Sequence, residues 1–520
     1  MRSTFYGLNI ATSGLFTAQK QLDVMGHNIA NANTEGYSRQ RFITQAVPPP
    51  GYNPQFAVIE KGQVGQGVST LSLDQIRDRF LDRQFRQENS KNAYWSTRSS
   101  ALYYVEDVFN GDQSTSLSGI IGTFFNAVQE LSKNPTDEAI RTNMTQETRK
   151  MTDVFHSYYD QMRDLMYQQD YALQQQVQVV NEYTAQIVAL NENIFKYEQG
   201  GQVANDLRDQ RNLLLDKMSS LVDITYQEVG TGKYNINGRE LTKLQVNIGA
   251  EGAMLIDHLE SRALIAEQDE SNDVTDAMDQ PLPTEKLLHS IRFEDTGELL
   301  EMSSGELLSL QDIRDGNEKD NQGLPYFIAR LDELAKAIVE VFNDVHMNGY
   351  TAPYTDLNGE FHESTTGIPF FDVTGLTASK IALSEEILAS GFNIAASSEL
   401  VTKDEEGHFN TGNNINALDL IRLVKERNDI PIIGSFEGYF KSYISEMAAE
   451  VGHANQMSAA EMVLVDSLSA QKLSVMGVSV DEEMTDMIRF QHAYNAAARS
   501  ITAMDEMLEM LIMRTGRVGL

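Results

Sequence analysis

The 520-residue sequence contains no cysteine. This absence excludes disulfide bonds, thiolate metal sites and thiol catalysis together. Signature motifs of enzymes are also missing, because the chain has no H-E-x-x-H, no G-x-S-x-G, no P-loop and no twelve-residue calcium loop. Its nine histidines form no pair at the spacing of metal ligands. We therefore predict no catalytic residue, no cofactor and no metal site.

Long apolar runs are missing as well. No uninterrupted run approaches the length of about 20 residues that a transmembrane helix needs. The N-terminus lacks the apolar core of a cleaved signal peptide, since Ser3, Thr4, Asn9 and Thr12 interrupt it. These features predict no membrane insertion and no conventional secretion, so any export from the cell needs another route.

Basic residues are scarce. The chain has 41 Lys and Arg residues against 75 Asp and Glu residues, which gives a formal net charge of -34. Binding to a phosphate backbone needs clustered Lys and Arg, and no such cluster is visible along the sequence. We predict no nucleic-acid partner and interpret the acidity as a soluble surface whose charges repel one another.

Apolar residues recur at alternating steps of three and four through the first thirty residues. This period places them on one narrow seam of a helix, as in a coiled coil, although an amphipathic helix packed on its own domain would fit equally well. A turn-forming run at residues 31–37 ends the helix. The N-terminal seam consists of Leu8, Ala11, Leu15, Ala18, Leu22, Met25 and Ile29.

A similar pattern lies at the other end of the chain, although Gln491 and Asp505 occupy two intervening places. Two seams of similar length at opposite termini predict that the terminal helices pair with each other. The methionines of this segment favour contact with more than one partner, because their thioether side chains are flexible. The C-terminal seam consists of Met484, Met487, Tyr494, Ala498, Ile501, Leu508 and Ile512.

Both ends carry a family resemblance. Residues 7–40, GLNIATSGLFTAQKQLDVMGHNIANANTEGYSRQ, resemble the N-terminal signature of bacterial flagellar axial proteins, the family of rod, hook and hook-associated proteins. Residues 478–508, VSVDEEMTDMIRFQHAYNAAARSITAMDEML, resemble the C-terminal signature of that family. In the family the two termini form paired helices in the inner core of a tubular polymer. The resemblance thus implies a homo-oligomer, a ring or tube, with assembly interfaces on both seams.

Two motifs in the middle narrow the resemblance to hook-associated members at the hook–filament junction. They are LSKNPTDEAIR at 131–141 and NDLRDQRNLLLDKMSSLVDI at 205–224, where Arg208 and Asn212 depart from the family's usual pattern. The implied partners are the hook protein, a second junction protein or the filament, and a cytosolic export chaperone that binds the C-terminal seam. The implied location is the extracellular flagellum, reached by flagellar type III export without a cleaved signal peptide.

Three alternatives stay open. A flagellar hook or rod protein shares the N-terminal signature but is disfavoured by the two middle motifs and by the long helical middle region. An intracellular scaffold protein could use its termini as an ordinary coiled coil. An enzyme with an unrecognised fold is the most remote alternative.

The pattern along the chain predicts a mostly α fold with an inserted β domain (α+β). Helical spacing covers 74–109, 137–199, 207–221, 324–347 and most of the chain after 416, with a break at Met476–Gly477. Strand-like alternation and turns fill 225–310 and 350–412, and Tyr234–Gly238 predicts a hairpin turn. We predict three parts: a terminal coiled-coil domain (1–50 and 475–520), a helical-bundle middle domain (51–225, 311–350 and 411–474) and an outer β-rich domain (226–310 and 351–410).

The terminal seams contain few large apolar side chains. Seven seam residues, two of them alanine, provide little burial to hold about thirty residues in a helix. We therefore expect both ends to be disordered in the free subunit and to become helical only on assembly.

Overall fold

The computed structural model describes residues 6–49, 64–109, 116–268, 288–355, 359–403, 409–426 and 436–515. The predicted fold class is confirmed, because the chain is mostly helical with small antiparallel sheets. It divides into two compact units, one made of residues 1–90, 180–263 and 462–520, the other of 91–179 and 264–461. Helices α2 (Arg79–Phe109), α4 (Glu138–Gln199) and α10 (Phe436–Met476) contribute residues to both. The three-part division of the sequence stays a prediction.

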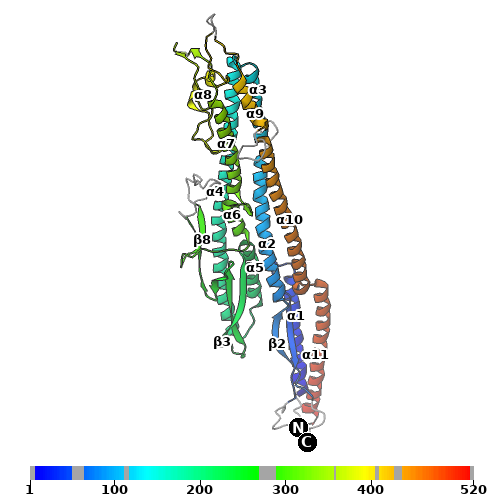
Figure 1. Cartoon of the computed structure of the whole chain (residues 1–520). Helices are drawn as coiled ribbons and strands as arrows, with labels where there is room; N and C mark the ends of the chain where they lie inside the picture. The colour runs from blue at the N-terminus through cyan, green and yellow to red at the C-terminus, as the bar shows by residue number, and fades with distance from the viewer. Residues whose placement is uncertain are drawn as a thin grey trace. The chain divides into compact units, whose positions relative to one another are not determined.

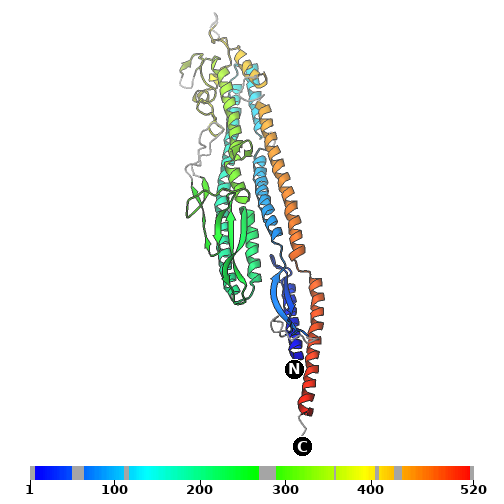
Figure 2. The same ribbon diagram turned by 60° about the horizontal axis from the view of Figure 1, so that its bottom comes forward.

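The first unit contains both chain ends. Helices α1 (Tyr6–Ala30) and α11 (Val480–Thr515) lie side by side in both views (Figures 1 and 2). Strands β1 (Gln40–Ala46) and β2 (Val68–Gln75) form an antiparallel pair that packs on α1, with a register shift after Ile43. The terminal segments are therefore helical and paired within a single chain in this structure, and the expected disorder of the ends in the free subunit stays a prediction.

The break between α10 and α11 falls where the sequence predicts it, at Met476 and Gly477. The Gly477 N–H donates to the Leu473 carbonyl oxygen at 2.8 Å and so closes the last turn of α10. A side chain at position 477 would collide with that same carbonyl oxygen. Glycine is therefore required here by a close backbone approach.

The first unit also holds a four-stranded antiparallel sheet in the order β3-β4-β5-β6. Its strands are β3 (Ile224–Tyr234), β4 (Glu240–Ile248), β5 (Ala253–Asp257) and β6 (Glu260–Ser261). The predicted hairpin turn connects β3 and β4, where Asn235 accepts hydrogen bonds from the backbone of Asn237 and Arg239 and Gly238 has a φ of 77°. Asn191 of α4 donates to the carbonyl of His258 at 2.9 Å and ties that helix to the sheet. Helix α5 (Asn205–Leu221) precedes β3.

The second unit is built around helix α7 (Leu324–Met347), which buries apolar residues along most of its length. Helices α3 (Leu117–Lys133), α6 (Glu306–Asp315), α8 (Glu385–Ala389) and α9 (Ile415–Glu426) belong to it. Its strands pair two by two: β7 (Leu264–Gln268) with β8 (His289–Phe293), β9 (Asn317–Glu318) with β10 (Asn321–Gln322), and β11 (Tyr354–Thr355) with β12 (Phe361–His362). The region predicted as β-rich at 351–410 thus holds very short strands and isolated bridges in its described part.

Four phenylalanines form the aromatic centre of this unit. Phe342 of α7 packs against Phe370 with ring centroids 4.7 Å apart and against Phe124 of α3 at 5.3 Å. Phe371 completes the cluster at 5.7 Å from Phe342. All four rings are buried. This cluster fixes the long segment after α7 onto the helices.

His346 is the buried polar residue at the end of α7. Its Nδ1–H donates to the Ile368 carbonyl and its Nε2 accepts from the Ala395 N–H, each at 2.8 Å. Because an amide can only donate, Nε2 must be unprotonated and the ring neutral. Burial lowers the pKa of His346 to about 4.

We expect the second unit to lose stability as the pH falls from about 6.5 towards 4. In that window the unfolded chain binds a proton at this histidine that the folded chain excludes, so the loss reaches on the order of 3 kcal/mol. Urea unfolding at pH 7 and pH 4.5, followed by fluorescence of Trp95, measures it, since Trp95 is the single tryptophan. The His346→Gln variant, which cannot titrate, should show a smaller pH dependence; an equal dependence would contradict this assignment.

Candidate functional site: the paired terminal helices

Helices α1 and α11 run antiparallel to each other. Gly7, near the start of α1, lies against Met504, and a Cβ added at Gly7 would meet the Met504 Cε at 2.9 Å. Asn28, near the end of α1, contacts Glu483 at the start of α11. The two chain ends thus form one helical pair, as the two seams predict.

The N-terminal seam lies partly inside this pair. Ala18 and Met25 are buried, and the other five seam residues are half-buried. Helix α1 also contacts β1 and β2, where Ser13 Oγ accepts from the Val68 N–H at 3.2 Å. Because α1 has neighbours on two sides, its covered surface is wider than a two-stranded coiled-coil seam.

The C-terminal seam has both covered and exposed residues in the single chain, and its role as an assembly interface stays a prediction. Met484 and Ile512 are 49% and 72% exposed, whereas the other five seam residues are half-buried. Met484 turns outward because Glu483 beside it is the buried residue, and Ile512 lies two turns beyond Met504, which faces Gly7. The partly covered face follows steps of three and four without interruption through Met487, Phe490, Tyr494, Ala497, Ile501, Met504 and Leu508. Gln491 and Asp505 lie off this face and are exposed.

Asn28 is the polar centre of the pair and is fully buried. Its Nδ2 donates to the Gln40 carbonyl and to Glu483 Oε2, each at 3.0 Å. Its Oδ1 accepts from the Gln40 N–H at 3.0 Å and from the Tyr37 hydroxyl at 2.8 Å. Every hydrogen-bonding position of this amide is used, so α1, β1 and α11 are joined through one side chain.

Glu483 is a buried carboxylate whose side chain has no exposed surface. Arg39 Nε donates to its Oε1 at 2.7 Å, and Arg39 Nη1 reaches the exposed Glu482 at 3.0 Å. The Arg39 N–H also donates to the Met476 carbonyl at 2.8 Å, so the segment after α1 is held against the start of α11. A buried charge is tolerated only with such partners. We call Asn28, Tyr37, Arg39, Gln40 and Glu483 the terminal clamp.

Helix α5 forms hydrogen bonds with the segment that carries three of the clamp residues. Asp209 accepts hydrogen bonds from the N–H and Oγ of Ser38 at 2.9 and 2.7 Å, and Arg77 lies 3.4 Å from the same carboxylate. Burial raises the pKa of Asp209 to about 6. Asp206 accepts from the Gln40 amide at 2.6 Å. The motif at 205–224 therefore holds the segment that follows α1, a role that its spacing alone did not reveal.

Burial and nearby carboxylates raise the pKa of Tyr37 well above its usual value. Burial contributes most, followed by Asp206, Asp209 and Glu483. The phenol therefore keeps its proton at neutral pH and donates to Asn28. The sequence pattern missed these clamp residues, because residues 31–37 indicated only the end of a helix. The available signal was a run of Asn, Tyr, Arg and Gln directly after an apolar seam.

Large apolar side chains are exposed on the last two helices, α10 and α11. On the last part of α10 they are Met462, Val463, Leu464, Leu473 and Val475, and on α11 they are Val480, Met484, Ile488, Met507, Met510, Leu511, Ile512 and Met513. By length and composition, one helical stretch within Gly438–Met513 is apolar enough to cross a membrane, and only 11% of that stretch is buried. Charged residues such as Asp466 and Lys472 interrupt the apolar residues of this region, so it contains no uninterrupted apolar run of that length. Extended exposed apolar surface indicates an interaction site.

In the part of the chain that the structure describes, no group of three or more His, Asp or Glu side chains is arranged to hold a metal ion. The arrangement at the termini consists of helix packing and the hydrogen bonds of the terminal clamp. Its chemistry suits association with other chains.

Three protein-family models match the chain. The flagella basal body rod protein model matches residues 8–37, and the model of the C-terminal part of flagellar basal body rod FlgEFG proteins matches residues 469–513. These segments contain most of α1 and α11, so the terminal helix pair defines a flagellar axial protein. The third model, the helical domain of the flagellar hook-associated protein FlgK, matches residues 102–371.

Full-length relatives agree with this match. Flagellar hook-associated protein 1 of Bacillus subtilis (strain 168) is 33% identical over 540 residues and covers 100% of both chains. The protein of the same name from Escherichia coli (strain K12) is 24% identical and covers 97% of this chain and 99% of its own. The chain belongs to the flagellar hook-associated protein 1 family, whose members are structural proteins and not enzymes.

A solved structure shares the fold. The flagellar hook junction protein FlgK from Burkholderia pseudomallei matches with a TM-score of 0.55 at 15% identity, over 76% of this chain and 100% of that chain. At this identity the likeness concerns the fold alone.

Proposed function

We propose that the chain is a structural subunit of the bacterial flagellum that joins the hook to the filament and assembles through its terminal helices. The observation that carries this proposal is the antiparallel pair of α1 and α11, clamped by Asn28 and Glu483, with apolar residues left exposed outside it. The clamp fixes the pair as one unit, and neighbouring subunits bury its outer apolar faces. Removing those faces from water supplies the driving force for assembly.

The same exposed apolar surface supports the proposed partners of the chain. The neighbours on the two sides of the subunit are the hook protein and either a second junction protein or the filament. Before export a cytosolic chaperone covers the exposed methionines of α11, since their flexible side chains adapt to different partners. The chain then leaves the cell through the flagellar export apparatus without loss of a signal peptide and functions in the extracellular flagellum.

A hook or rod protein is the second candidate, because such proteins share the terminal signatures. The match of residues 102–371 to the FlgK helical domain favours the junction role.

A strain that lacks the gene for this chain tests the role. We expect electron microscopy to show intact hooks without filaments, and expression of the chain from a plasmid to restore the filaments. Filaments of normal length and number in the deletion strain would overturn the proposal. Loss of the hooks as well would favour the hook or rod alternative.

A further inference from the structure

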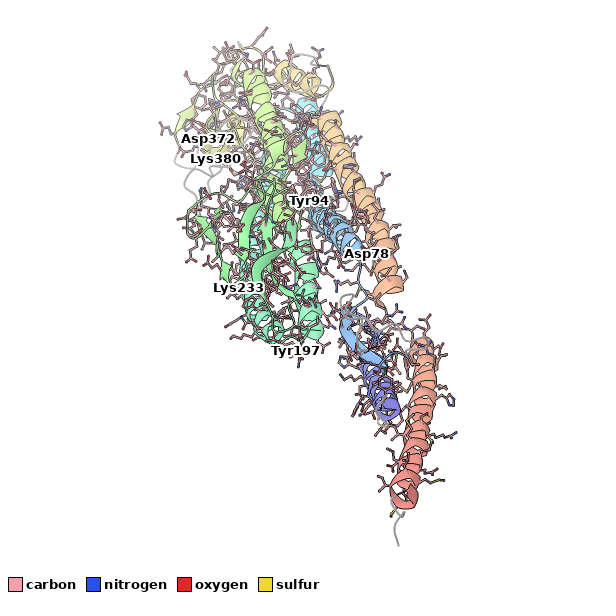
Figure 3. The ribbon with its side chains drawn as sticks, turned by 90° about the horizontal axis from the view of Figure 1, so that it is seen from below. Asp78, Tyr94, Tyr197, Lys233, Asp372 and Lys380 are labelled. Carbon is pink, nitrogen blue, oxygen red and sulfur yellow. The ribbon has the colours of Figure 1, made fainter. Side chains whose placement is uncertain are left out.

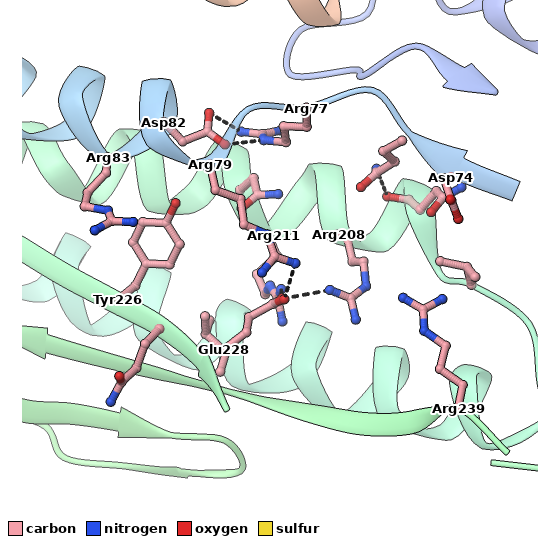
Figure 4. Close-up of a pocket in the computed structure, with 16 residues that line it drawn as sticks. Asp74, Arg77, Arg79, Asp82, Arg83, Arg208, Arg211, Tyr226, Glu228 and Arg239 are labelled. Atoms are coloured by element: carbon pink, nitrogen blue, oxygen red, sulfur yellow. Dashed lines mark hydrogen bonds and ion pairs between the residues drawn. The ribbon is translucent and has the colours of Figure 1, made fainter. Parts of the chain in front are cut away.

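The first unit contains a polar pocket that the assembly role does not use. Its volume is about 590 Å³. Residues from the β2–α2 segment, from α5 and its preceding loop, and from β3 and β4 with their turn line it (Figure 4). Three carboxylates line it, those of Asp74, Asp82 and Glu228. They face six arginines: Arg77, Arg79, Arg83, Arg208, Arg211 and Arg239.

Arg208 and Arg211 are almost completely buried and share the carboxylate of Glu228. Arg208 Nη1 lies 2.7 Å from Glu228 Oε1, and Arg79 reaches the other oxygen of the same carboxylate at 3.0 Å. The guanidinium groups of three arginines therefore form ion pairs with the single carboxylate of Glu228. Glu198 accepts two further hydrogen bonds from Arg208, at 2.8 and 3.0 Å, and adds a second negative charge beside it.

Arg211 is incompletely paired. Its Nη1 donates to Asn191 Oδ1 at 2.9 Å and its Nη2 contacts Glu228, but its buried Nε has no hydrogen-bond partner in the part of the chain that the structure describes. Burial lowers the pKa of Arg211 to about 10. A buried polar nitrogen without a partner is uncommon and indicates a missing ligand or water.

Arg83 and Arg239 line the pocket from opposite sides. Figure 4 shows Arg83 beside Tyr226 and Arg239 on the side of Asp74. Both arginines are exposed, and neither guanidinium group forms an ion pair or a hydrogen bond with a residue that the structure describes. The pocket thus has two guanidinium groups without an acidic partner, although acidic residues greatly outnumber basic ones in this chain, whose net charge is -34.

From these two unpaired guanidinium groups beside four paired ones at one partly open pocket, we propose that the pocket binds a small polyvalent oxyanion, either a phosphate or a polycarboxylate. The planar fork of an arginine side chain matches the oxygens of both groups in a bidentate manner. Arg83 and Arg239 are the ligand-binding residues that respond to substitution, whereas Arg208 and Arg211 are also part of the fold. The proposal does not depend on the role in the flagellum.

Isothermal titration of the purified full chain at constant ionic strength tests it, with inorganic phosphate and citrate as separate probes. We expect saturable binding of at least one probe and a Kd at least tenfold higher in the variant Arg83→Gln/Arg239→Gln. Both replaced side chains are exposed, so circular dichroism should show an unchanged fold. Binding of phosphate alone assigns a phosphate ligand, and binding of citrate alone assigns a polycarboxylate.

The matched control is Lys217→Gln/Lys233→Gln, which removes two positive charges outside the pocket. Lys217 is exposed on α5, and Lys233 lies on β3 (Figure 3). We expect a Kd within twofold of the unmodified chain. Absence of saturable binding by both probes, or an equal loss of affinity in the control, would overturn the proposal.

Discussion

Replacing Glu483 by alanine is expected to weaken the pairing of α1 and α11 by about 2–4 kcal/mol. The same replacement at Glu482 should cost less than about 1 kcal/mol. Glu483 is completely buried and holds both Arg39 and Asn28, whereas the Glu482 side chain is 66% exposed and contacts Arg39 alone. The alanine at 483 removes two hydrogen bonds of a buried charge and leaves one N–H of Asn28 unpaired.

Amide hydrogen exchange of the purified full chain measures this difference. A loss of 2–4 kcal/mol makes exchange in α1 about 30- to 1000-fold faster, or brings it to the rate of an unfolded chain. Helix α7 in the second unit supplies an internal reference, because it should not change. The two variants remove equal charge from neighbouring positions near the start of α11, so they differ chiefly in burial. Equal effects of the two replacements would show that the clamp does not hold the pair.

The periodicity of the sequence predicted the elements that depend on local pattern. The two terminal helices, the break at Gly477 and the hairpin turn after Tyr234 all lie where spacing and turn chemistry place them. Pairing of the ends followed from two complementary seams. These features are predictable because each needs only a helical or strand period and the residues that interrupt it.

The clamp and the pocket depend on contacts between distant residues. Asn28 and Glu483 are 455 positions apart, and nothing in the local pattern of either indicates the other. The burial of Glu483 also fixes the rotation of α11, so Phe490, Ala497 and Met504, which the predicted seam did not contain, lie on its partly covered face.

The arginines of the pocket come from three separate segments. No cluster of basic residues is therefore visible along the sequence, although six of them meet around one volume. The expected disorder of the ends in the free subunit stays a prediction, and it too left out contacts between distant residues. The seams were weighed alone, without the hydrogen bonds of Asn28 and the ion pair of Arg39 with Glu483 that reinforce them.

Burial of the outer surface of α11 by other subunits is the central claim, and the absence of cysteine makes it directly measurable. A single cysteine at Ile512, whose side chain is 72% exposed, provides the only thiol in the chain. A second variant with Lys380→Cys places the thiol on an exposed residue of the second unit (Figure 3).

The measurement is the rate of maleimide labelling of each variant, in the verified monomer and in isolated hook–filament particles that contain the chain. We predict that the Ile512→Cys variant is labelled at least tenfold more slowly in the particles than in the monomer, because neighbouring subunits cover α11. The Lys380→Cys variant should be labelled in the particles and in the monomer at rates that agree within about twofold. Labelling of the Ile512→Cys variant at the same rate in particles and monomer would contradict assembly through the terminal helices.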